Sequence, residues 1–526
     1  MPSLPTVEFD VIVVGAGIVG CAAATAFAND GRKVLLIERD WKEPDRIVGE
    51  LLQPGGVKAL EQLGMQDCVK GIDAITCNGY RVIQGDKSIN LPYSYEDAKP
   101  GCAFHHGKFI MSLRTHAESC DNVTTLEGTV GSLLTDSEDD NTVVGVSYST
   151  KTEKAKLAYA PLTIVADGCF SKFRKEVNKK PVSVKSTFVG LILEDCKLPS
   201  PNHGHVILAQ PSPILFYQIG THETRALIDI PGTKIPSLTN GAMQEYMLNT
   251  VYPQLPKSIQ PSFKAAVDNN KFRSMPNSFL PAATNDRPGM VLLGDANNMR
   301  HPLTGGGMTV GFWDVVRLKQ LLSRENVPDL ADHAMVMTQV KKLHWQRNQL
   351  SSAVNILANA LYALFAAGDD LNTKVLQDGC FGYFELGGIC VSTPVGLLSG
   401  MLHSPSSLIL HFFAVALYGM YLQMCKGPFY MLPLHFYRAF MALVNAYHIS
   451  FIKARSAYVK EQLVRTEEIN YVREKMKWCY RREGVNHLQN CRHLTMQYME
   501  LARAAKLEWI KPFKMPAAST AAADEE

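Results

Sequence analysis

The sequence predicts an α/β fold in which a parallel-sheet domain is interleaved with a second, β-rich domain and followed by apolar helices. Three observations support this prediction. Residues up to about 100 alternate strand and helix patterns, residues 80–240 are rich in short β-type runs, and the pattern becomes helical after Phe312. Alternation of strands with helices is typical of parallel sheets, and short β runs indicate a separate sheet.

Composition limits the function classes. The chain has 526 residues, of which 46% are hydrophobic and 20% charged, which excludes a disordered or fibrous protein. The net charge of +3 makes no electrostatic case for a nucleic-acid partner. Twelve cysteines are scattered without a CxxC pair. We therefore expect reduced thiols on a cytosolic face, with neither a disulfide framework nor a zinc site.

The first motif follows the strand predicted over Phe9–Val14. Glycines stand at Gly15, Gly17 and Gly20, and an alanine-rich helix begins there. Gly15 allows the turn, Gly17 lets backbone amides approach a pyrophosphate, and Gly20 lets the helix pack close to the strand. A second apolar strand ends at Glu38, whose carboxylate can accept hydrogen bonds from a ribose diol. This spacing favours FAD or NAD over NADP.

Two later motifs distinguish FAD from NAD. A strand over 163–166 leads into Asp167-Gly168, and a buried run over 291–293 leads into Gly294-Asp295 and then the glycine run of 305–307. An aspartate after a buried strand and a glycine run opening a helix suit the ribityl and ring ends of a flavin. In this order the motifs resemble flavin monooxygenases of the aromatic-hydroxylase type, in which a Rossmann-like FAD-binding domain is interleaved with a β-rich substrate domain.

No second Gly-x-Gly-x-x-Gly unit follows a strand downstream, so a separate pyridine-nucleotide domain is not expected. The electrons must come from transient NADPH binding or from a partner protein.

Three longer strings carry a closer resemblance: 37–56 (IERDWKEPDRIVGELLQPGG), 104–114 (FHHGKFIMSLR) and 383–399 (YFELGGICVSTPVGLLS). From about Phe9 to about Ile452 the chain is similar to the squalene monooxygenase (squalene epoxidase) family. The resemblance implies residue roles at matching positions. The cofactor-binding positions, which include the three glycines of the first motif, are Gly15, Gly17, Ile18, Val19, Gly20, Glu38, Arg39, Arg46, Arg114, Val130, Asp295 and Met308.

The same resemblance implies an apolar substrate tunnel. Tyr93 matches a tyrosine beside the reacting end of the substrate and is the candidate catalytic residue. The substrate-binding positions are Tyr93, Phe365, Phe381, Phe384, Pro394, Leu397 and His411. The adjacent His105 and His106 could be metal ligands, but no third ligand has suitable spacing. We therefore expect both histidines to make hydrogen bonds and expect no metal site.

The implied reaction is epoxidation of squalene to (S)-2,3-epoxysqualene in sterol biosynthesis, with O₂ and NADPH-derived electrons, through a flavin C4a-hydroperoxide. The implied partners are an NADPH–cytochrome reductase and membrane lipid, without nucleic acid. Three alternatives remain open. An aromatic or polyketide hydroxylase has polar pocket residues, a prenyl reductase incorporates no oxygen, and a flavoprotein used for binding or electron transfer consumes no O₂ with any isoprenoid.

The domain boundaries follow from these patterns. We expect a discontinuous FAD-binding domain (1–80, 100–180 and 285–345), a substrate domain (81–99 and 181–284), apolar membrane-associated helices (346–460) and a polar tail of unknown role (461–526). The stretch Ser406–Cys425 contains no charged residue and reaches the length of a membrane span, but His411, Gly419 and Gln423 interrupt it. A second aromatic-rich stretch, Phe429–Ile452, suits an interface. We expect a monotopic protein on the cytosolic face of the endoplasmic reticulum membrane or of lipid droplets.

Overall fold

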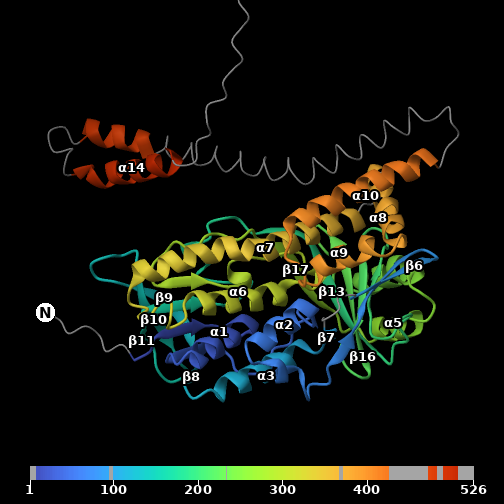
Figure 1. The fold of residues 1–526 in the computed structure, drawn as a ribbon, viewed down its shortest axis with the longest axis horizontal. Helices are drawn as coiled ribbons and strands as arrows, with labels where there is room; N and C mark the ends of the chain where they lie inside the picture. Colours follow the sequence, from blue (N-terminus) through green and yellow to red (C-terminus); the bar gives the residue numbers. More distant parts are fainter. Residues whose placement is uncertain are drawn as a thin grey trace, which may run out of the picture. The chain divides into compact units, whose positions relative to one another are not determined.

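The computed structural model describes residues 8–93, 99–232, 234–366, 371–425, 472–482 and 490–506. The chain forms two units, Met1–Ala442 and Leu443–Glu526. The first unit contains all the sheets that the structure describes (Figure 1). The domain boundaries expected within it stay a prediction.

A five-stranded parallel sheet forms where strand and helix patterns alternate in the sequence. Its spatial order is β18-β12-β1-β2-β8, so the first strand lies at the centre. Val11 pairs with Leu162 on one side and with Val34 on the other. The strands are β1 (Val11–Val14), β2 (Val34–Glu38), β8 (Val123–Glu127), β12 (Leu162–Val165) and β18 (Met290–Leu292).

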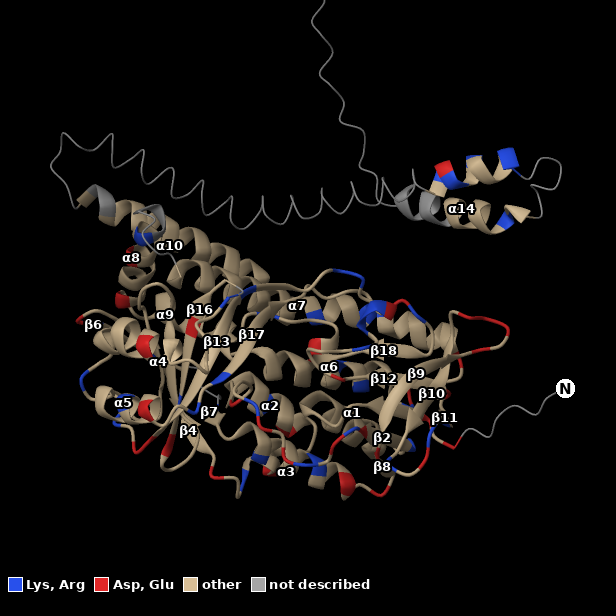
Figure 2. Cartoon of the chain, turned by 180° about the vertical axis from the view of Figure 1, so that it is seen from behind, with Lys and Arg blue, Asp and Glu red and all other residues tan. Residues whose placement is uncertain are grey.

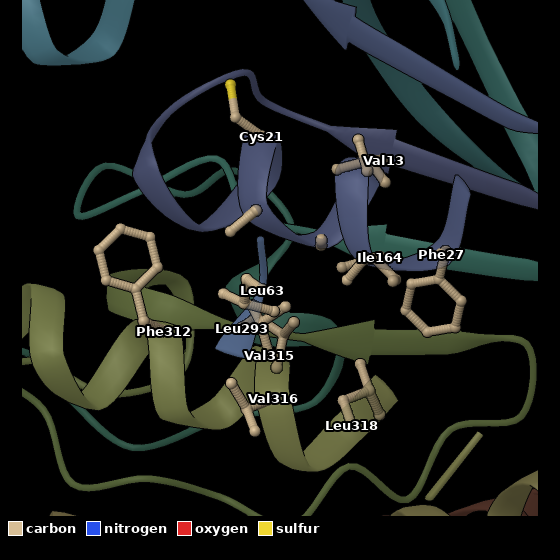
Figure 3. Packing of buried hydrophobic residues seen from close by; sticks show 14 of the residues in the cluster. Val13, Cys21, Phe27, Leu63, Ile164, Leu293, Phe312, Val315, Val316 and Leu318 are labelled. Atoms are coloured by element: carbon tan, nitrogen blue, oxygen red, sulfur yellow. The ribbon is translucent and has the colours of Figure 1, made fainter. Parts of the chain in front are cut away.

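Both faces of this sheet are covered, which explains why its strands read as continuous apolar runs. Val11 and Val13 contact the helix side, where Phe27 and Phe312 pack (Figure 3). Ile12 and the other alternate residues face an antiparallel three-stranded sheet of order β11-β10-β9. The covering elements are α1 (Ile18–Asn29), α3 (His106–Glu118), α6 (Gly307–Leu321), β9 (Thr129–Thr135), β10 (Val143–Ser149) and β11 (Lys156–Tyr159).

A seven-stranded sheet provides the β-rich part, in the order β17-β13-β16-β15-β14-β5-β6. Alternation along β13 sends Phe188 toward the core that also holds Tyr80 and Phe381, while Val189 faces a core with Phe263 of α5. The strands and covering helices are β5 (Gly79–Gln84), β6 (Lys87–Pro92), β13 (Ser183–Glu194), β14 (Gly204–Ile207), β15 (Ile214–Gln218), β16 (Glu223–Pro231), β17 (Arg273–Phe279), α4 (Ala242–Tyr246) and α5 (Gln260–Asp268).

A small antiparallel sheet has the order β3-β7-β4, with β7 at its centre. It brings the segment before α2 beside the segment before α3. Its strands and the helix that follows the first are β3 (Leu51–Leu52), β4 (Ile75–Cys77), β7 (Gly101–Ala103) and α2 (Pro54–Gln62).

The helical pattern that follows Phe312 in the sequence forms one long helix here. This helix, α7 (His333–Phe365), contains the apolar run Ala334–Leu343 and most of the run Leu350–Ala367. The polar residues between them contain no Gly or Pro, and the buried Arg347 pairs with Asp314 of α6 through N–O distances of 3.1 and 2.7 Å. The helices that follow are α8 (Leu371–Glu385), α9 (Ile389–Leu398) and α10 (Pro405–Cys425).

Helices α8 and α10 pack closely at two glycines. A Cβ at Gly379 would lie 2.7 Å from the Cα of Gly419, so the two backbones meet without side chains between them. The second aromatic-rich stretch, Phe429–Ile452, lies outside the described residues.

The second unit corrects one expectation. Cys479 and Cys491 form a disulfide with their Cα atoms 6.0 Å apart. The expectation of reduced thiols throughout was therefore wrong for this pair. The two cysteines are 12 positions apart in the sequence, and the hairpin of the helix over 472–482 and α14 (Arg492–Lys506) brings them together. The other ten cysteines are free.

Candidate active site

A cavity of about 220 Å³ lies where the carboxyl ends of β1, β12 and β18 face the seven-stranded sheet. Ligands of open parallel sheets bind at this edge. Six of the residues predicted to bind the cofactor line the cavity directly: Gly17, Ile18, Val19, Arg46, Asp295 and Met308.

The first glycine turn has the geometry that its motif predicts. Gly15 has a φ of +101°, in the region that favours glycine. A Cβ at Gly20 would lie 1.7 Å from the carbonyl oxygen of Gly15, so only glycine lets α1 begin this close to β1. A Cβ at Gly17 would meet nothing within 4 Å, and this open space borders the cavity. The turn therefore leaves room for a pyrophosphate at the N-terminus of α1.

Glu38 and Arg114 stabilise the same turn from the side. The Glu38 carboxylate accepts a hydrogen bond from the Ala16 amide at 2.8 Å, and Arg114 Nε donates to the Ala16 carbonyl at 2.9 Å. The Arg114 guanidinium also stacks over Trp41, 4.9 Å from the ring centroid. Both residues support the turn without lining the cavity. Gly15, Gly20, Arg39 and Val130 do not line it either, and Val130 packs in the core between the parallel and three-stranded sheets.

At the other end of the cavity, the buried Arg174 connects the two aspartate motifs. Its guanidinium donates to the Cys169 carbonyl at 2.7 Å and to the Asp295 carbonyl at 3.1 Å, while Nε donates to the Ala296 carbonyl at 2.9 Å. Asp167 Oδ1 beside it is buried without a hydrogen-bond partner. An unsatisfied acceptor next to a cavity suits a ligand with hydroxyl donors. The open Gly17 and this oxygen together fit FAD.

A buried ion pair forms the wall opposite α1. Arg225 donates two hydrogen bonds to Glu50, with N–O distances of 2.9 and 2.7 Å, and the Tyr217 hydroxyl donates to Glu50 at 3.0 Å. Glu50 and Tyr217 line the cavity. Burial and the adjacent Glu50 charge raise the pKa of Tyr217, which keeps its hydroxyl protonated as a donor.

The two histidines singled out in the sequence make protein hydrogen bonds. His106 lies 2.9 Å from the Gly49 carbonyl through Nδ1, and burial lowers the pKa of His106 to about 4. The imidazole is therefore neutral at pH 7, and Nδ1–H donates. His105 contacts Glu223. Among the residues that the structure describes, no group of three or more His, Cys, Asp or Glu could hold a metal ion.

A second cavity, of about 70 Å³, adjoins the first. It lies between the seven-stranded sheet and helices α7, α8 and α9, and its walls include four of the predicted substrate residues. These are Phe365, Phe381, Phe384 and Pro394. Its walls are almost entirely apolar side chains, so it suits a hydrocarbon chain.

Leu397, His411 and Tyr93 do not line this cavity. Leu397 packs with Ala353 and Leu408 behind it. His411 Nδ1 lies 2.9 Å from the Tyr383 hydroxyl, which joins α10 to α8. All three support the elements around the cavity.

Tyr80 is a residue that the sequence analysis missed. It lines both cavities, as does Leu303. Its hydroxyl accepts a hydrogen bond from Gln53 Nε2 and lies 3.3 Å from the Thr304 carbonyl. Gln53 Oε1 in turn accepts from the Tyr93 hydroxyl at 2.6 Å. Tyr93 is thus connected to Tyr80, at the junction between the cavities, through one intervening residue, Gln53.

The sequence contains a weak signal for Tyr80, which is the glycine directly before it. Gly79 has a φ of +154°, and a Cβ at Gly79 would lie 2.4 Å from the Leu91 carbonyl. Tyr80 lies on β5 and Tyr93 directly follows the adjacent β6, and their rings meet edge-on with 5.9 Å between centroids. Only the pairing of Tyr80 with Leu91 determines which tyrosine borders both cavities.

An open hollow of about 610 Å³ lies beside the apolar cavity. Phe384 lines both of them. The hollow lies between β6 and the turn from α8 to α9, where Gly387 and Gly388 have φ values of +68° and +53°. The two helices are bent there by 110°. The Phe384 side chain therefore lies between the hollow and the apolar cavity.

Comparison with known proteins identifies relatives of the chain. The squalene epoxidase family model matches residues 159–437, and the FAD-dependent oxidoreductase model matches residues 10–44. Squalene epoxidase erg1 of Aspergillus fumigatus is 50% identical over 443 residues, which cover 83% of this chain and 91% of that protein. Squalene epoxidase 1 of Arabidopsis thaliana is 48% identical over 413 residues, covering 78% of this chain and 77% of that protein.

Solved structures share the fold. The flavin-dependent brominase Bmp2 superposes with a TM-score of 0.61 at 16% identity, covering 78% of this chain and 98% of its own. PqsL of Pseudomonas aeruginosa in complex with 2-aminobenzoylacetate has a TM-score of 0.58 at 18% identity, covering 68% of this chain and 96% of its own. The predicted fold class, a flavin-monooxygenase α/β fold, is confirmed.

Proposed function

Because the chain belongs to the squalene epoxidase family, and is an FAD-dependent monooxygenase that epoxidises squalene with O₂ in sterol biosynthesis, we propose where its two cavities hold the reactants. FAD occupies the cavity beside Gly17, Asp295 and Met308. The reacting end of squalene occupies the apolar cavity between β5, α8 and α9. The observation that carries this proposal is that Tyr80 and Leu303 border both cavities.

When bound, the reduced flavin activates O₂ and supplies the oxygen atom that is transferred. The protein's own residues position the alkene and exclude water. Leu303 and the phenyl ring of Tyr80 close the junction between the cavities. Gln53 holds the Tyr80 hydroxyl, and Tyr93 orients Gln53 from behind. No protein nucleophile is needed, so we assign Tyr80 and Tyr93 to positioning.

Shape determines which part of squalene reacts, since a hydrocarbon has no polar group to bind. Phe365, Phe381 and Phe384 contribute the large apolar surfaces of the second cavity. Burial of apolar surface is worth about 25 cal/mol per Å² relative to water. Squalene dissolved in a membrane has already left water, so the net gain from entering the cavity is small. Selection of one terminal double bond therefore rests on fit.

We also propose that the protein attaches to a membrane through α10. Within the described residues, Pro405–Leu422 is long and apolar enough to cross a bilayer, and the bent pair α8–α9 passes the same test if it is taken as one segment. One face of α10 packs on α8, while Leu410 and Leu417 on the other are 68% and 58% exposed. A helix with one packed and one exposed apolar face suits a monotopic arrangement, as on the cytosolic face of the endoplasmic reticulum or a lipid droplet.

The hollow beside Phe384 then offers squalene a route from the lipid. Leu386 and Ile389 at its rim are 55% and 70% exposed. These side chains add exposed apolar surface beside the opening. Squalene entering here reaches the second cavity without crossing water.

The electrons come from a separate NADPH–cytochrome reductase, since the sequence contains a single dinucleotide-binding motif. The test is a detergent assay with purified protein, squalene, FAD, NADPH, ¹⁸O₂ and an added reductase, analysed by mass spectrometry. We expect an epoxide that carries one ¹⁸O only when the reductase is present. Full-rate turnover without reductase would contradict the electron-donor proposal.

The placement of the reactants has its own test. Phe384→Trp should narrow the approach and reduce squalene turnover at least tenfold, while the protein retains FAD. Tyr252→Phe is the aromatic control, because Tyr252 is half-buried against the core that holds Phe263 and lines neither cavity. Loss of FAD in Phe384→Trp, or unchanged turnover, would place squalene elsewhere.

A further inference from the structure

The second unit contains a structured element that the squalene epoxidase model does not reach, because that model ends at residue 437. Two helices, residues 472–482 and α14, lie side by side and are closed by the Cys479–Cys491 disulfide (Figure 1). The Tyr480 hydroxyl lies 2.7 Å from Thr495 Oγ1 and adds a second link between them. We refer to residues 472–482 and 490–506 as the tail hairpin.

The tail hairpin is strongly basic. Its sequence contains eight Lys and Arg residues against two Glu, whereas the rest of the chain contains 45 basic and 48 acidic residues. The positive net charge of the whole protein therefore comes from this short element. Lys and Arg appear on both of its helices (Figure 2). Arg473, Arg481 and Arg492 are all exposed.

Apolar side chains are exposed among these charges. Trp478 is 70% exposed, and Met496 and Met499 are 60% and 44% exposed. Trp478 also lines an open hollow of about 740 Å³ in the hairpin. The other residues around this hollow are Glu474, Lys475, Cys479, Arg482, Asn490, His493 and Leu494. An aromatic side chain and several cations thus share one surface.

We propose that the tail hairpin is a docking surface for a membrane that contains anionic lipids. Charge complementarity carries the proposal: basic side chains contribute about 1 kcal/mol each beside an anionic leaflet, a roughly fivefold gain in affinity per residue. Trp prefers the boundary between headgroups and acyl chains, and methionine adapts to an irregular apolar surface. The exposed Trp478, Met496 and Met499 have no evident use in a purely electrostatic contact with nucleic acid.

The disulfide helps to form this surface. Trp478 immediately precedes Cys479, and Arg492 immediately follows Cys491. The cross-link therefore keeps the aromatic side chain of one helix and the first arginine of the other together. Binding through this surface depends on lipid charge, whereas the contact proposed for α10 depends on apolar area. The two attachments can be measured separately.

The experiment uses the full-length holoprotein and sedimentation with two kinds of vesicle, phosphatidylcholine alone and phosphatidylcholine with phosphatidylserine. We expect at least tenfold tighter binding to the anionic vesicles at low salt, and loss of this preference at high salt. The triple variant Arg473→Gln, Arg481→Gln, Arg492→Gln should lose most of the preference and still bind neutral vesicles. Trp478→Ala should weaken binding to anionic vesicles severalfold.

Two matched variants complete the design. Lys257→Gln, Lys264→Gln, Lys271→Gln removes three exposed charges from the region of α5 and should leave the preference unchanged. Replacing the three hairpin arginines by lysine should retain it, which separates charge from damage to the fold. Detergent-solubilised squalene epoxidation should be the same in all variants, because none of them changes a residue that lines either cavity.

Three results would overturn the proposal. The first is equal binding of the wild-type protein to neutral and anionic vesicles. The second is an unchanged preference in the glutamine variant. The third is displacement of the anionic vesicles by a single-stranded RNA or an acidic peptide at lower concentration than by soluble phosphoserine headgroups, which would assign the surface to another class of macromolecule.

Discussion

At the scale of single residues, two tyrosines and one glutamine determine how the cavities meet. Tyr80→Phe removes the hydroxyl between Gln53 and the Thr304 carbonyl at the junction. An unmade buried hydrogen bond costs about 1–3 kcal/mol, so we expect kcat to fall about tenfold with FAD retained. Tyr93→Phe acts through Gln53 and should cost less, about threefold.

Steady-state epoxidation by the two variants tests this order, with Tyr252→Phe as control. A larger loss in Tyr93→Phe than in Tyr80→Phe would show that Tyr93, the residue predicted from the sequence, is closer to the reacting alkene.

His106 makes the stability of the FAD-binding region depend on pH. Burial lowers the pKa of His106 from 6.5 to about 4. The unfolded chain therefore binds a proton between pH 6.5 and 4 that the folded protein does not bind. The contribution of His106 to stability is complete above pH 6.5 and is lost as the pH falls through this window, by about 2 kcal/mol at pH 5.

Urea unfolding followed by flavin fluorescence at pH 7 and pH 5 measures this contribution. In His106→Gln the loss of stability on acidification should be smaller by about 2 kcal/mol. His203→Gln, in an exposed turn, is the control. An identical pH dependence in His106→Gln and the wild type would mean that other groups determine it.

At the scale of secondary-structure elements, α10 packs against α8, which forms one wall of the apolar cavity. Gly379→Leu places a side chain where the Cα of Gly419 lies 2.7 Å from a Cβ. Overpacking of this kind costs about 1–3 kcal/mol and separates the two helices. Because α8 presents Phe381 and Phe384 to the cavity, we expect a raised KM for squalene with FAD binding unchanged.

Gly131→Leu on β9 is the matched control, since a Cβ there meets only Ser147 O at 3.6 Å. Both variants are assayed for FAD content and for the dependence of rate on squalene concentration. A normal KM in Gly379→Leu would show that α10 does not shape the substrate cavity.

At the scale of the whole molecule, the monotopic arrangement that we propose predicts on which side of the membrane the tail lies. In a monotopic arrangement, a tag after Glu526 and the catalytic unit lie on the same side of the membrane. Protease added to intact microsomes should then digest both. The test is immunoblotting for the tag with and without detergent, and protection of the tag in intact microsomes would indicate a spanning helix.

Local signals allowed much of the fold and the flavin end of the site to be predicted from the sequence. The turn at Gly15, the carboxylate at Glu38 and the motif at Asp295 each follow a buried strand directly, and the parallel sheet brings such strand ends together. Apolar runs in the sequence likewise allowed β12 and α10 to be predicted. The prediction of reduced cysteines failed because spacing along the chain does not reveal which helices form a hairpin.

The sequence by itself determined the family, the cofactor and the order of the elements, because these depend on short motifs whose geometry is set by neighbouring residues. The tertiary structure decided which side chains share a cavity. Tyr80 and Phe384 come from segments about 300 residues apart, and strand register and helix packing alone bring them to one apolar cavity. Cys479 and Cys491 are close in sequence, yet their pairing also depends on how two helices pack.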